Sequence, residues 1–364
     1  DKAAQGGDDK AASGSTRSNG RDGRNYRQSV AGGSEIVAGV MRIETITSAQ
    51  NGKIKTLLSL MEKSRARSEA GLFVVEGQRE LGHCLDAGFI PETLFVCGEV
   101  MARRAAASSD GAGGDSLATG NSHTGANDGH IVANIEGKDG IEALVAKAEA
   151  LNPRLTLVQI PAFLYEKVAY RGSTEGIIAE VRRVPRRLED LHLGESPLVV
   201  VLESVEKPGN LGAVLRSADA AGADAVIVCD PLTDIWNPNL LRSSVGAIFS
   251  VQVAVCTSAE AMAFLKERGI RILTAQLQDS EWYYDADMRS ATALVMGTES
   301  TGLTQAWRDA ADAHIKIPML GRLDSLNVSA SAAVLLYEAV RQRKSAFPDA
   351  AQSAEKRILS SEKI

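Results

Sequence analysis

Three segments in the second half of the chain place small, polar and charged residues directly after runs that are expected to be apolar strands. In the first, residues 203–217, Asn210 is expected to cap a helix through its side-chain oxygen. Arg216 follows on the same otherwise apolar helix, and a buried guanidinium there requires an anion. Either a ligand phosphate or a core carboxylate, such as Glu203 or Glu299, supplies that anion.

The other two segments combine glycines with polar side chains. In residues 294–303 a hydrophobic strand runs into a turn with Gly297 and Gly302, where main-chain N–H and C=O groups stay open to a ligand. The turn lacks both the Gly-Lys-Ser/Thr ending of a P-loop and the GxGxxG spacing, which argues against nucleotide-phosphate binding of those kinds. Residues 317–333 hold a glycine-containing apolar loop, and three polar residues crowd the start of the helix that follows: Ser325, Asn327 and Ser329.

The surrounding elements predict that these segments meet. From residue 197 onward, apolar strands alternate with helices, which is typical of a mostly parallel sheet covered on both faces. The expected strands are residues 198–202, 225–229, 251–255, 271–275, 292–296 and 315–317, and one of the expected helices is residues 243–249. Open sheets of this class bind ligands at the carboxyl ends of their strands, so we expect one site there.

Composition divides the chain of 364 residues into unequal parts. Polar stretches poor in apolar residues cannot bury enough surface to fold alone. The expected divisions are a disordered extension at 1–42, a small α/β domain at 43–181 with a flexible insertion at 105–134, a linker at 182–196, a larger α/β domain at 197–345 and a polar tail at 346–364. The linker holds four arginines around a proline, and we leave open whether it is merely solvated or contacts RNA.

Charge is distributed unevenly along the chain. The formal net charge of −6 would by itself argue against a nucleic-acid partner. Residues 188–364 hold 16 Lys and Arg against 23 Asp and Glu, whereas residues 51–187 hold 17 of each, so the acidity belongs to the larger domain. The smaller domain therefore remains compatible with a basic RNA-binding surface, for which the candidate residues are Lys63, Arg65, Arg67 and Arg171.

Other classes of site have little support in the sequence. The four cysteines are far apart, with no CxxC pair and no zinc-ligand spacing, so we expect reduced thiols and no metal. No run approaches the roughly 18 apolar residues of a membrane span, and the predicted location is cytoplasmic. A nicotinamide-dependent enzyme is disfavoured because no GxGxxG follows a strand.

Taken in order, the three segments resemble the motifs of the SpoU (TrmH-type) RNA ribose 2′-O-methyltransferases, a family of the SPOUT superfamily. The motifs are Asn210-x-Gly212-x-x-x-Arg216, Gly297-x-Glu299-x-x-Gly302-Leu303, and Ile317-Pro318-Met319 with Ser325-Leu326-Asn327-Val328-Ser329. The smaller domain is similar to that family's substrate-binding module, through residues 51–55, 71–77 and 174–179. The sequence differs from many relatives at Ser300 and Thr301, where they place another glycine.

This resemblance implies a fold, a cofactor and a reaction. The fold would be a SPOUT α/β domain with a deep trefoil knot, in a homodimer with each site near the interface. The cofactor would be S-adenosylmethionine, held by Gly297, Ile317, Met319 and Leu326. The reaction would transfer its methyl group to a ribose 2′-hydroxyl.

The resemblance also implies roles for the catalytic residues. Arg216 would either accept the hydroxyl proton, against the ordinary rule that arginine stays protonated, or position a phosphate and stabilise the developing alkoxide. Its orienting partners would be Asn210, Glu299, Ser325 and Asn327. The expected substrate is rRNA. The alternatives are a tRNA 2′-O-methyltransferase and a noncatalytic RNA-binding ribosome-assembly protein of the same fold.

Overall fold

The computed structural model describes residues 41–109, 140–170, 175–298 and 300–346, all within the unit that spans Gly39–Ile364. Most of the predicted extension, insertion and tail therefore lies outside the described residues, as do Arg171 and Glu299. Among the described helices, none has the length and apolar composition that a membrane crossing requires.

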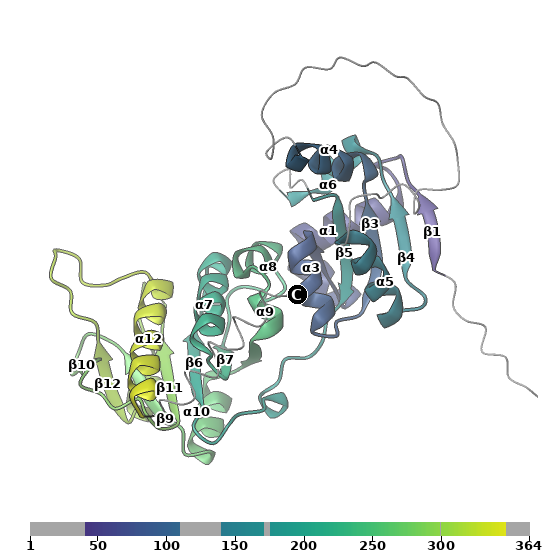
Figure 1. Cartoon of the computed structure of the whole chain (residues 1–364). Coiled ribbons are helices and arrows are strands. Elements are labelled where there is room, and N and C mark those ends of the chain that lie inside the picture. Colours follow the sequence, from purple (N-terminus) through teal and green to yellow (C-terminus); the bar gives the residue numbers. More distant parts are fainter. Residues whose placement is uncertain (1–40, 110–139, 171–174, 299, 347–364) are drawn as a thin grey trace, which may run out of the picture. The chain divides into compact units, whose positions relative to one another are not determined.

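The first sheet has five strands and is mixed (Figure 1). Its order is β1 (Arg42–Thr45), β4 (Thr156–Gln159), β3 (Pro91–Val96), β5 (Ile177–Arg182) and β2 (Leu72–Glu76). β5 runs antiparallel to both of its neighbours, whereas β1, β4 and β3 are parallel to one another. β2 and β3 are therefore parallel to each other, with the antiparallel β5 between them.

Helices cover both faces of the first sheet. They are α1 (Gly52–Glu62), α2 (Ser64–Ala70), α3 (Gln78–Asp86), α4 (Gly98–Ser109), α5 (Ile141–Leu151) and α6 (Ala162–Val168). Successive side chains of a strand point to opposite faces, so Phe73 and Val75 join the hydrophobic cluster that contains α3 and α5. Val74 joins the cluster that contains α1 and α6. Because side chains on both faces of β2 are buried, its sequence is a continuous apolar run.

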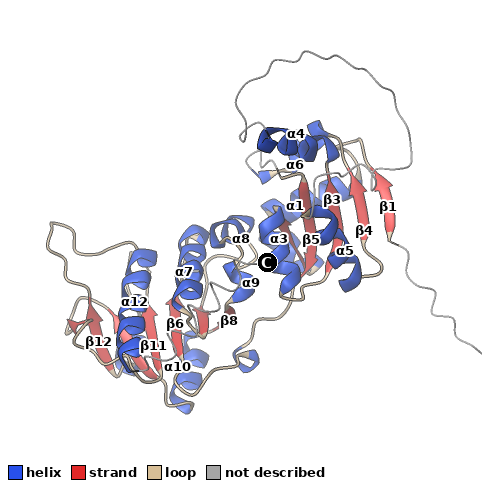
Figure 2. Cartoon of the chain, in the orientation of Figure 1, coloured by secondary structure: helices blue, strands red, loops and turns tan. Residues whose placement is uncertain are grey.

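The second sheet has seven strands, and every pairing in it is parallel (Figure 2). Its order is β10 (Glu281–Trp282), β12 (Ala313–Lys316), β9 (Arg271–Ala275), β11 (Thr292–Met296), β6 (Leu198–Glu203), β7 (Ala225–Cys229) and β8 (Gln252–Cys256). The predicted parallel α/β architecture is confirmed. All these strands end at one edge, which is the arrangement that brings the three polar segments together.

Helices also cover both faces of the second sheet. They are α7 (Pro208–Ala221), α8 (Pro238–Ser244), α9 (Ala247–Ser250), α10 (Ser258–Glu267), α11 (Gln305–Ala310) and α12 (Val328–Ala346), with a 3-10 turn at Leu188–Asp190. α7 and α12 pack with Val200 of β6, whereas α10 and α11 pack with Val199 and Val201. Both faces of β6 are thus buried, and its sequence shows no alternation.

Two predictions about helices were wrong. The single helix expected at 243–249 is broken between α8 and α9, because Val245 and Gly246 adopt φ values of 55° and 89°. Asn210 does not cap α7, because the helix begins earlier, at Pro208, with Lys207 as the N-cap residue. Proline at the first helical position is favoured because its missing N–H needs no partner there.

A linker arginine is held inside the protein. The guanidinium of Arg186 lies 5.3 Å from the ring centroid of Phe89 and 5.5 Å from that of Trp236, and it donates a hydrogen bond of 3.1 Å to the carbonyl of Ile248. Trp236 in turn stacks on Phe73 of β2, with centroids 4.4 Å apart. Burial lowers the pKa of Arg186 to about 10. The two sheets share this aromatic packing, and Arg186 stabilises it.

Candidate active site

The carboxyl ends of β9, β11 and β12 surround a cavity of about 350 Å³, which we call the larger cavity. Loop residues between β12 and α12 complete its wall. Its lining includes all four residues predicted to bind the cofactor, Gly297, Ile317, Met319 and Leu326. Ser325, from the predicted catalytic set, also lines it. The volume lies within the range of small-molecule sites, and the sequence motifs therefore converge on one hollow.

A buried carboxylate at the end of β6 holds the loop after β11 in place. Glu203, at the end of β6, accepts hydrogen bonds from the backbone N–H of Thr304 at 2.8 Å and from its hydroxyl at 2.7 Å. Within the loop, the hydroxyl of Thr298 accepts from the N–H of Thr301 at 3.0 Å, and the N–H of Gly302 donates to the Thr298 carbonyl at 3.0 Å. Glu203 therefore holds this loop and does not pair with Arg216, as one prediction allowed.

Gly297 is required by the loop itself. A Cβ atom at this position would collide with the backbone of Gly302 and Leu303, because the two sides of the loop touch here. A side chain here would therefore displace the loop backbone that shapes the cavity.

Two residues that line the larger cavity each have a buried polar atom with no hydrogen-bond partner among the described residues. These atoms are Oε1 of Gln276, which follows β9, and Nε of Arg308 on α11. A buried polar atom without a partner is costly, so these two atoms favour a polar ligand with one donor and one acceptor group. Neither residue was predicted, because neither belongs to a motif, and only the position of Gln276 after a strand was a signal.

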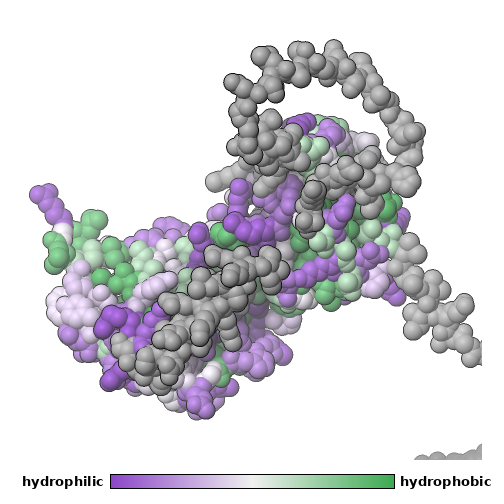
Figure 3. All heavy atoms as spheres, in the orientation of Figure 1, coloured by the Kyte–Doolittle hydropathy of each residue, from purple (hydrophilic) through white to green (hydrophobic). Residues whose placement is uncertain are grey.

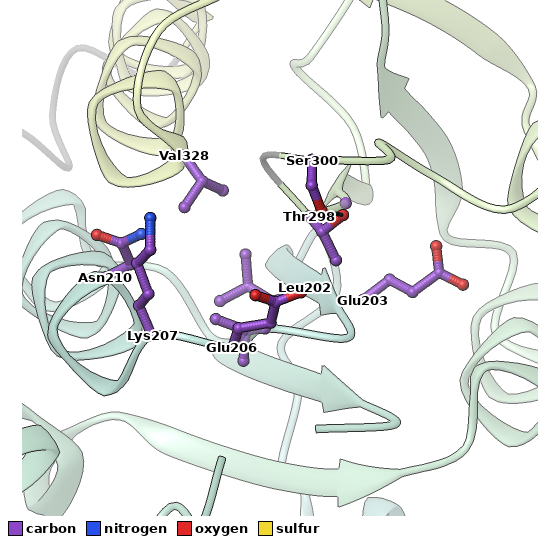
Figure 4. A pocket seen from close by; sticks show the side chains of 10 residues that line it. Leu202, Glu203, Glu206, Lys207, Asn210, Thr298, Ser300 and Val328 are labelled. Atoms are coloured by element: carbon purple, nitrogen blue, oxygen red, sulfur yellow. Dashed lines mark hydrogen bonds between the residues drawn. The ribbon is translucent and has the colours of Figure 1, made fainter. Parts of the chain in front are cut away.

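Figure 4 shows a second cavity of about 270 Å³, the smaller cavity, which adjoins the first through shared lining residues. The turn from β6 into α7 lines it with Glu206, Lys207 and Asn210. The two cavities share part of their linings, which we call the shared wall: Gly297, Thr298, Ser300 and Val328. Figure 4 shows Asn210 and Lys207 facing Thr298 and Ser300 across this hollow. Glu206 and Lys207 were not predicted.

Two predicted catalytic amides meet although they lie far apart in the sequence. The side-chain N–H of Asn327 donates to the Asn210 side-chain oxygen at 3.3 Å. The Asn327 oxygen accepts from the N–H and the hydroxyl of Ser329, at 3.0 and 2.6 Å, and so begins α12. This pair connects the first motif to the third beside the smaller cavity, which Asn210 lines.

Arg216 lies apart from both cavities. It is exposed on α7 and lines neither of them, so the prediction of a buried guanidinium on this helix was wrong. The buried face of α7 consists of residues at helical spacing, Leu211, Val214, Leu215 and Ala218. Arg216 falls off that stripe. Glu299, the remaining member of the predicted catalytic set, lies outside the described residues.

The predicted RNA-binding arginines differ in exposure. Arg67 is buried, with its side chain 2% exposed, and its Nε donates to the Asp234 carboxylate at 2.7 Å. Its Nη1 donates to the carbonyl of Leu60 at 2.7 Å. Arg67 is therefore structural, and its assignment as an RNA contact was wrong. Lys63 and Arg65 are exposed, and Arg65 pairs with Glu69 at 2.6 Å.

The described residues provide no metal site. Within the described ranges, no group of three or more His, Cys, Asp or Glu side chains is placed to hold a metal ion. The four thiols are free, and burial raises the pKa of Cys84 far above its usual range, which keeps this sulfur protonated.

Comparison with known proteins identifies the family. Residues 197–337 match the model of the SpoU rRNA methylase family, and residues 51–119 match an MRM3-like substrate-binding domain. A 23S rRNA (guanosine-2′-O-)-methyltransferase, RlmB of Vibrio vulnificus, is 36% identical over 195 residues, which are 52% of this chain and 79% of that protein. A 23S rRNA (uridine(2479)-2′-O)-methyltransferase of Streptomyces viridochromogenes is 34% identical over 194 residues, 51% of this chain and 67% of that protein.

A solved structure gives the same result. The SpoU methyltransferase AviRb of Streptomyces viridochromogenes, in complex with the cofactor AdoMet, covers 81% of this chain and 100% of its own, with 26% identity and a TM-score of 0.64. The two matched domains and the identities to these relatives agree with one another. The chain therefore belongs to the SpoU family of RNA 2′-O-ribose methyltransferases, which are S-adenosylmethionine-dependent enzymes.

Proposed function

We propose that this protein transfers a methyl group from S-adenosylmethionine to a ribose 2′-hydroxyl of rRNA. The observation that carries the proposal is the pair of adjoining cavities, in which one wall serves both. The larger cavity holds the residues of the second and third motifs, and the smaller cavity holds Asn210 of the first. A methyl transfer needs donor and acceptor side by side, and adjoining cavities supply that placement.

The larger cavity fits the cofactor. S-adenosylmethionine, when bound, supplies an electrophilic methyl group on a sulfonium. Apolar side chains at Ile317, Met319 and Leu326 suit an adenine ring. The unpartnered Nε of Arg308 suits the cofactor's carboxylate, and the unpartnered Oε1 of Gln276 suits one of its amino groups. With these assignments, the cofactor supplies the hydrogen-bond partners that Nε of Arg308 and Oε1 of Gln276 lack among the described residues.

The smaller cavity is assigned to the acceptor nucleotide. Asn210 lines it and is hydrogen-bonded to Asn327, and we assign to these two amides the orientation of the ribose. Ser325 lines the adjoining larger cavity. These residues position the 2′-hydroxyl and exclude water, and their loss is expected to lower turnover more than stability.

Arg216 is proposed to act in the site of a second copy. Its exposure on α7, outside both cavities of its own chain, leaves it available to a partner. The loop before α12 exposes Leu320 and Leu323 by 98% and 75%, and Tyr337 of α12 is half exposed. Figure 3 shows hydrophobic residues gathered on that loop. Large exposed apolar side chains mark an interaction surface, and a homodimer through α12 covers them.

In that dimer the role of Arg216 follows from its chemistry. Guanidinium stays protonated and offers a planar fork of donors, so it holds a phosphate and stabilises the alkoxide that forms as the hydroxyl attacks. Direct acceptance of the proton by Arg216 remains the alternative.

Three finer features remain predictions: the deep trefoil knot, a cytoplasmic location and rRNA rather than tRNA as substrate. Support for rRNA comes from the family match and from the named activities of the relatives. The relatives are named for guanosine in one case and uridine in the other, so they do not supply the target base.

The proposal is tested by incubating the full chain with radiolabelled S-adenosylmethionine and total RNA from cells that lack the gene. We expect label in a 2′-O-methylnucleoside of rRNA. Label confined to tRNA supports the alternative substrate. RNA binding without any transfer, by protein that binds the cofactor, supports the noncatalytic alternative.

The shared site of the dimer is tested by complementation. An Arg216→Ala chain and a Gly297→Val chain are each expected to be inactive. When the two are mixed and allowed to exchange, one of the two sites in each mixed dimer regains both components, and activity returns. Absence of recovery in a mixed dimer confirmed by mass would place Arg216 in its own chain's site.

A further inference from the structure

The smaller cavity is lined by two charged residues that the three motifs do not explain. Glu206 and Lys207 both line it, and both belong to the turn between β6 and α7. The turn is tightly defined. Ser204 adopts a φ of 52°, a region that favours glycine, and its N–H donates to the Cys229 carbonyl at 2.8 Å. Strained backbone of this kind is found where side chains must be aimed at a ligand.

Figure 4 shows where the turn directs these side chains. The Glu206 carboxylate lies in the hollow between the side formed by Asn210 and Lys207 and the side formed by Thr298. No described residue donates a hydrogen bond to it or forms an ion pair with it. The carboxylate is therefore an acceptor available to a ligand beside the shared wall.

A carboxylate in this position discriminates among the four bases. Its two oxygens only accept hydrogen bonds, and two adjacent N–H donors bind it best. Guanine presents two such donors, N1–H and the N2 amino group, side by side on its Watson–Crick edge. Adenine and cytosine each place an amino group beside a ring nitrogen that repels a carboxylate, and uracil places one N–H between two carbonyls. Unpaired RNA bases are recognised on this edge.

We propose that Glu206 reads the base of the acceptor nucleotide and that this base is guanine. The proposal rests on the function proposed above, because it assigns the smaller cavity to the acceptor. Lys207 carries its charge on the same turn and attracts the phosphate of that nucleotide, a contact that positions RNA without base preference. Glu206 is thus a specificity-determining residue, and Lys207 a positioning residue.

The first test identifies the labelled nucleoside. The full chain is incubated with tritiated S-adenosylmethionine and total RNA from cells that lack the gene, the RNA is digested to nucleosides, and the label is assigned by chromatography and mass. We expect 2′-O-methylguanosine. Label in 2′-O-methyluridine, -cytidine or -adenosine overturns the proposal while leaving the methyltransferase function intact. No label in any nucleoside contradicts the proposed function itself.

The second test uses substitutions. Glu206→Gln replaces one acceptor oxygen with a donor, and we expect kcat/KM for the RNA to fall about 10- to 100-fold, the scale of a lost charged hydrogen-bond pair. An RNA with inosine at the mapped position lacks the N2 donor. Wild-type protein should discriminate against it, and Glu206→Gln should lose most of that discrimination.

Matched controls come from the end of α10. Glu267→Gln and Lys266→Ala alter an equally exposed charged pair away from both cavities, and they should leave the RNA kinetics unchanged. Lys207→Ala should weaken RNA binding equally for guanosine and inosine substrates. Equal guanosine-to-inosine ratios for wild type and Glu206→Gln, with cofactor affinity and Tm preserved, would overturn the role of Glu206.

Discussion

The two sheets of this protein are similar in size but differ in the direction of their strands. In the seven-stranded sheet every strand is parallel, so every loop that leaves a carboxyl end emerges at the same edge. Both cavities lie there. In the five-stranded sheet β5 runs against its neighbours, and the carboxyl ends are divided between two edges. Parallel topology gathers polar loops into one site, whereas mixed topology disperses them.

Polar residues accordingly have different roles in the two sheets. In the parallel sheet, Glu203 holds the loop that shapes the larger cavity. Around the mixed sheet, buried charged groups such as Arg67 of α2 and Glu180 of β5 lie within the packing. Substitutions of buried charged groups around the five-stranded sheet should therefore lower the free energy of unfolding. Substitutions at the carboxyl edge of the seven-stranded sheet should change ligand binding or the rate of turnover. The following predictions test that division, from the largest expected effect to the smallest.

Gly297→Val should abolish binding of S-adenosylmethionine. The new side chain collides with the backbone of Gly302 and Leu303 and forces the cavity loop open. Isothermal calorimetry on folded variant protein measures the effect. Gly321→Val is the control, because no atom lies near its added Cβ, and it should bind the cofactor. Wild-type affinity in a folded Gly297→Val protein would show that the loop tolerates rearrangement.

Arg216→Lys should lower the single-turnover rate at saturating RNA by about 100-fold or more, the scale of a lost catalytic proton-transfer or charge-stabilising group. Lysine keeps the charge but loses the planar fork. Because Arg216 is exposed, we expect the Tm and the cofactor affinity to remain near wild type. An undiminished rate at saturation removes Arg216 from the catalytic residues, and a large fall in Tm would make it structural.

Arg67→Met should lower the free energy of unfolding by about 3–5 kcal/mol, because it leaves the Asp234 carboxylate buried without its cation. Urea titration followed by circular dichroism measures the change. The side chain of Arg65 is 89% exposed and pairs with Glu69 at the surface, so Arg65→Met should change the free energy of unfolding by about 0.5 kcal/mol or less. Equal losses for the two variants would mean that burial of Arg67 contributes nothing.

Glu180→Gln should remove part of the pH dependence of stability. Burial raises the pKa of Glu180 to about 7, against a hydrogen bond from Thr93 that lowers it, and one of its oxygens has no described partner. The folded protein therefore holds this proton between about pH 4.5 and 7, where the unfolded chain releases it. Stability then falls as pH rises through that window.

The measurement compares the unfolding free energy of wild type and Glu180→Gln at pH 5 and pH 8. From pH 5 to pH 8 the free energy of unfolding of the wild type should fall by about 2–3 kcal/mol more than that of Glu180→Gln, since glutamine does not ionise. Parallel curves for the two proteins would show that Glu180 titrates normally.

Much of this architecture was predictable from the sequence, and the exceptions have physical reasons. Apolar β-branched runs identified β6, β7 and β11 because parallel strands are buried on both faces. β10 was missed because two exposed residues carry no such pattern. The break after α8 was missed because it depends on Val245 at positive φ, a conformation that its side chain disfavours.

The candidate site, like the fold, was predicted from the sequence only in part. The motifs predicted which residues line the larger cavity, because family resemblance preserves order and spacing. The position of Arg216 was misjudged although the signal was present. The buried residues of α7 follow a helical stripe from Leu211 to Ala218, and Arg216 lies off it. Gln276 and Arg308 became visible only in three dimensions, since an unpartnered atom has no sequence signature.

The shared wall also has a thermodynamic consequence. Gly297, Thr298, Ser300 and Val328 face both hollows, so a ligand that shifts them on one side alters the free energy of binding on the other. This linkage is reciprocal: whatever factor the cofactor imposes on the dissociation constant of RNA, RNA imposes on that of the cofactor. Any coupling between cofactor and RNA that passes through the shared wall therefore depends on four residues, three of them in a single turn.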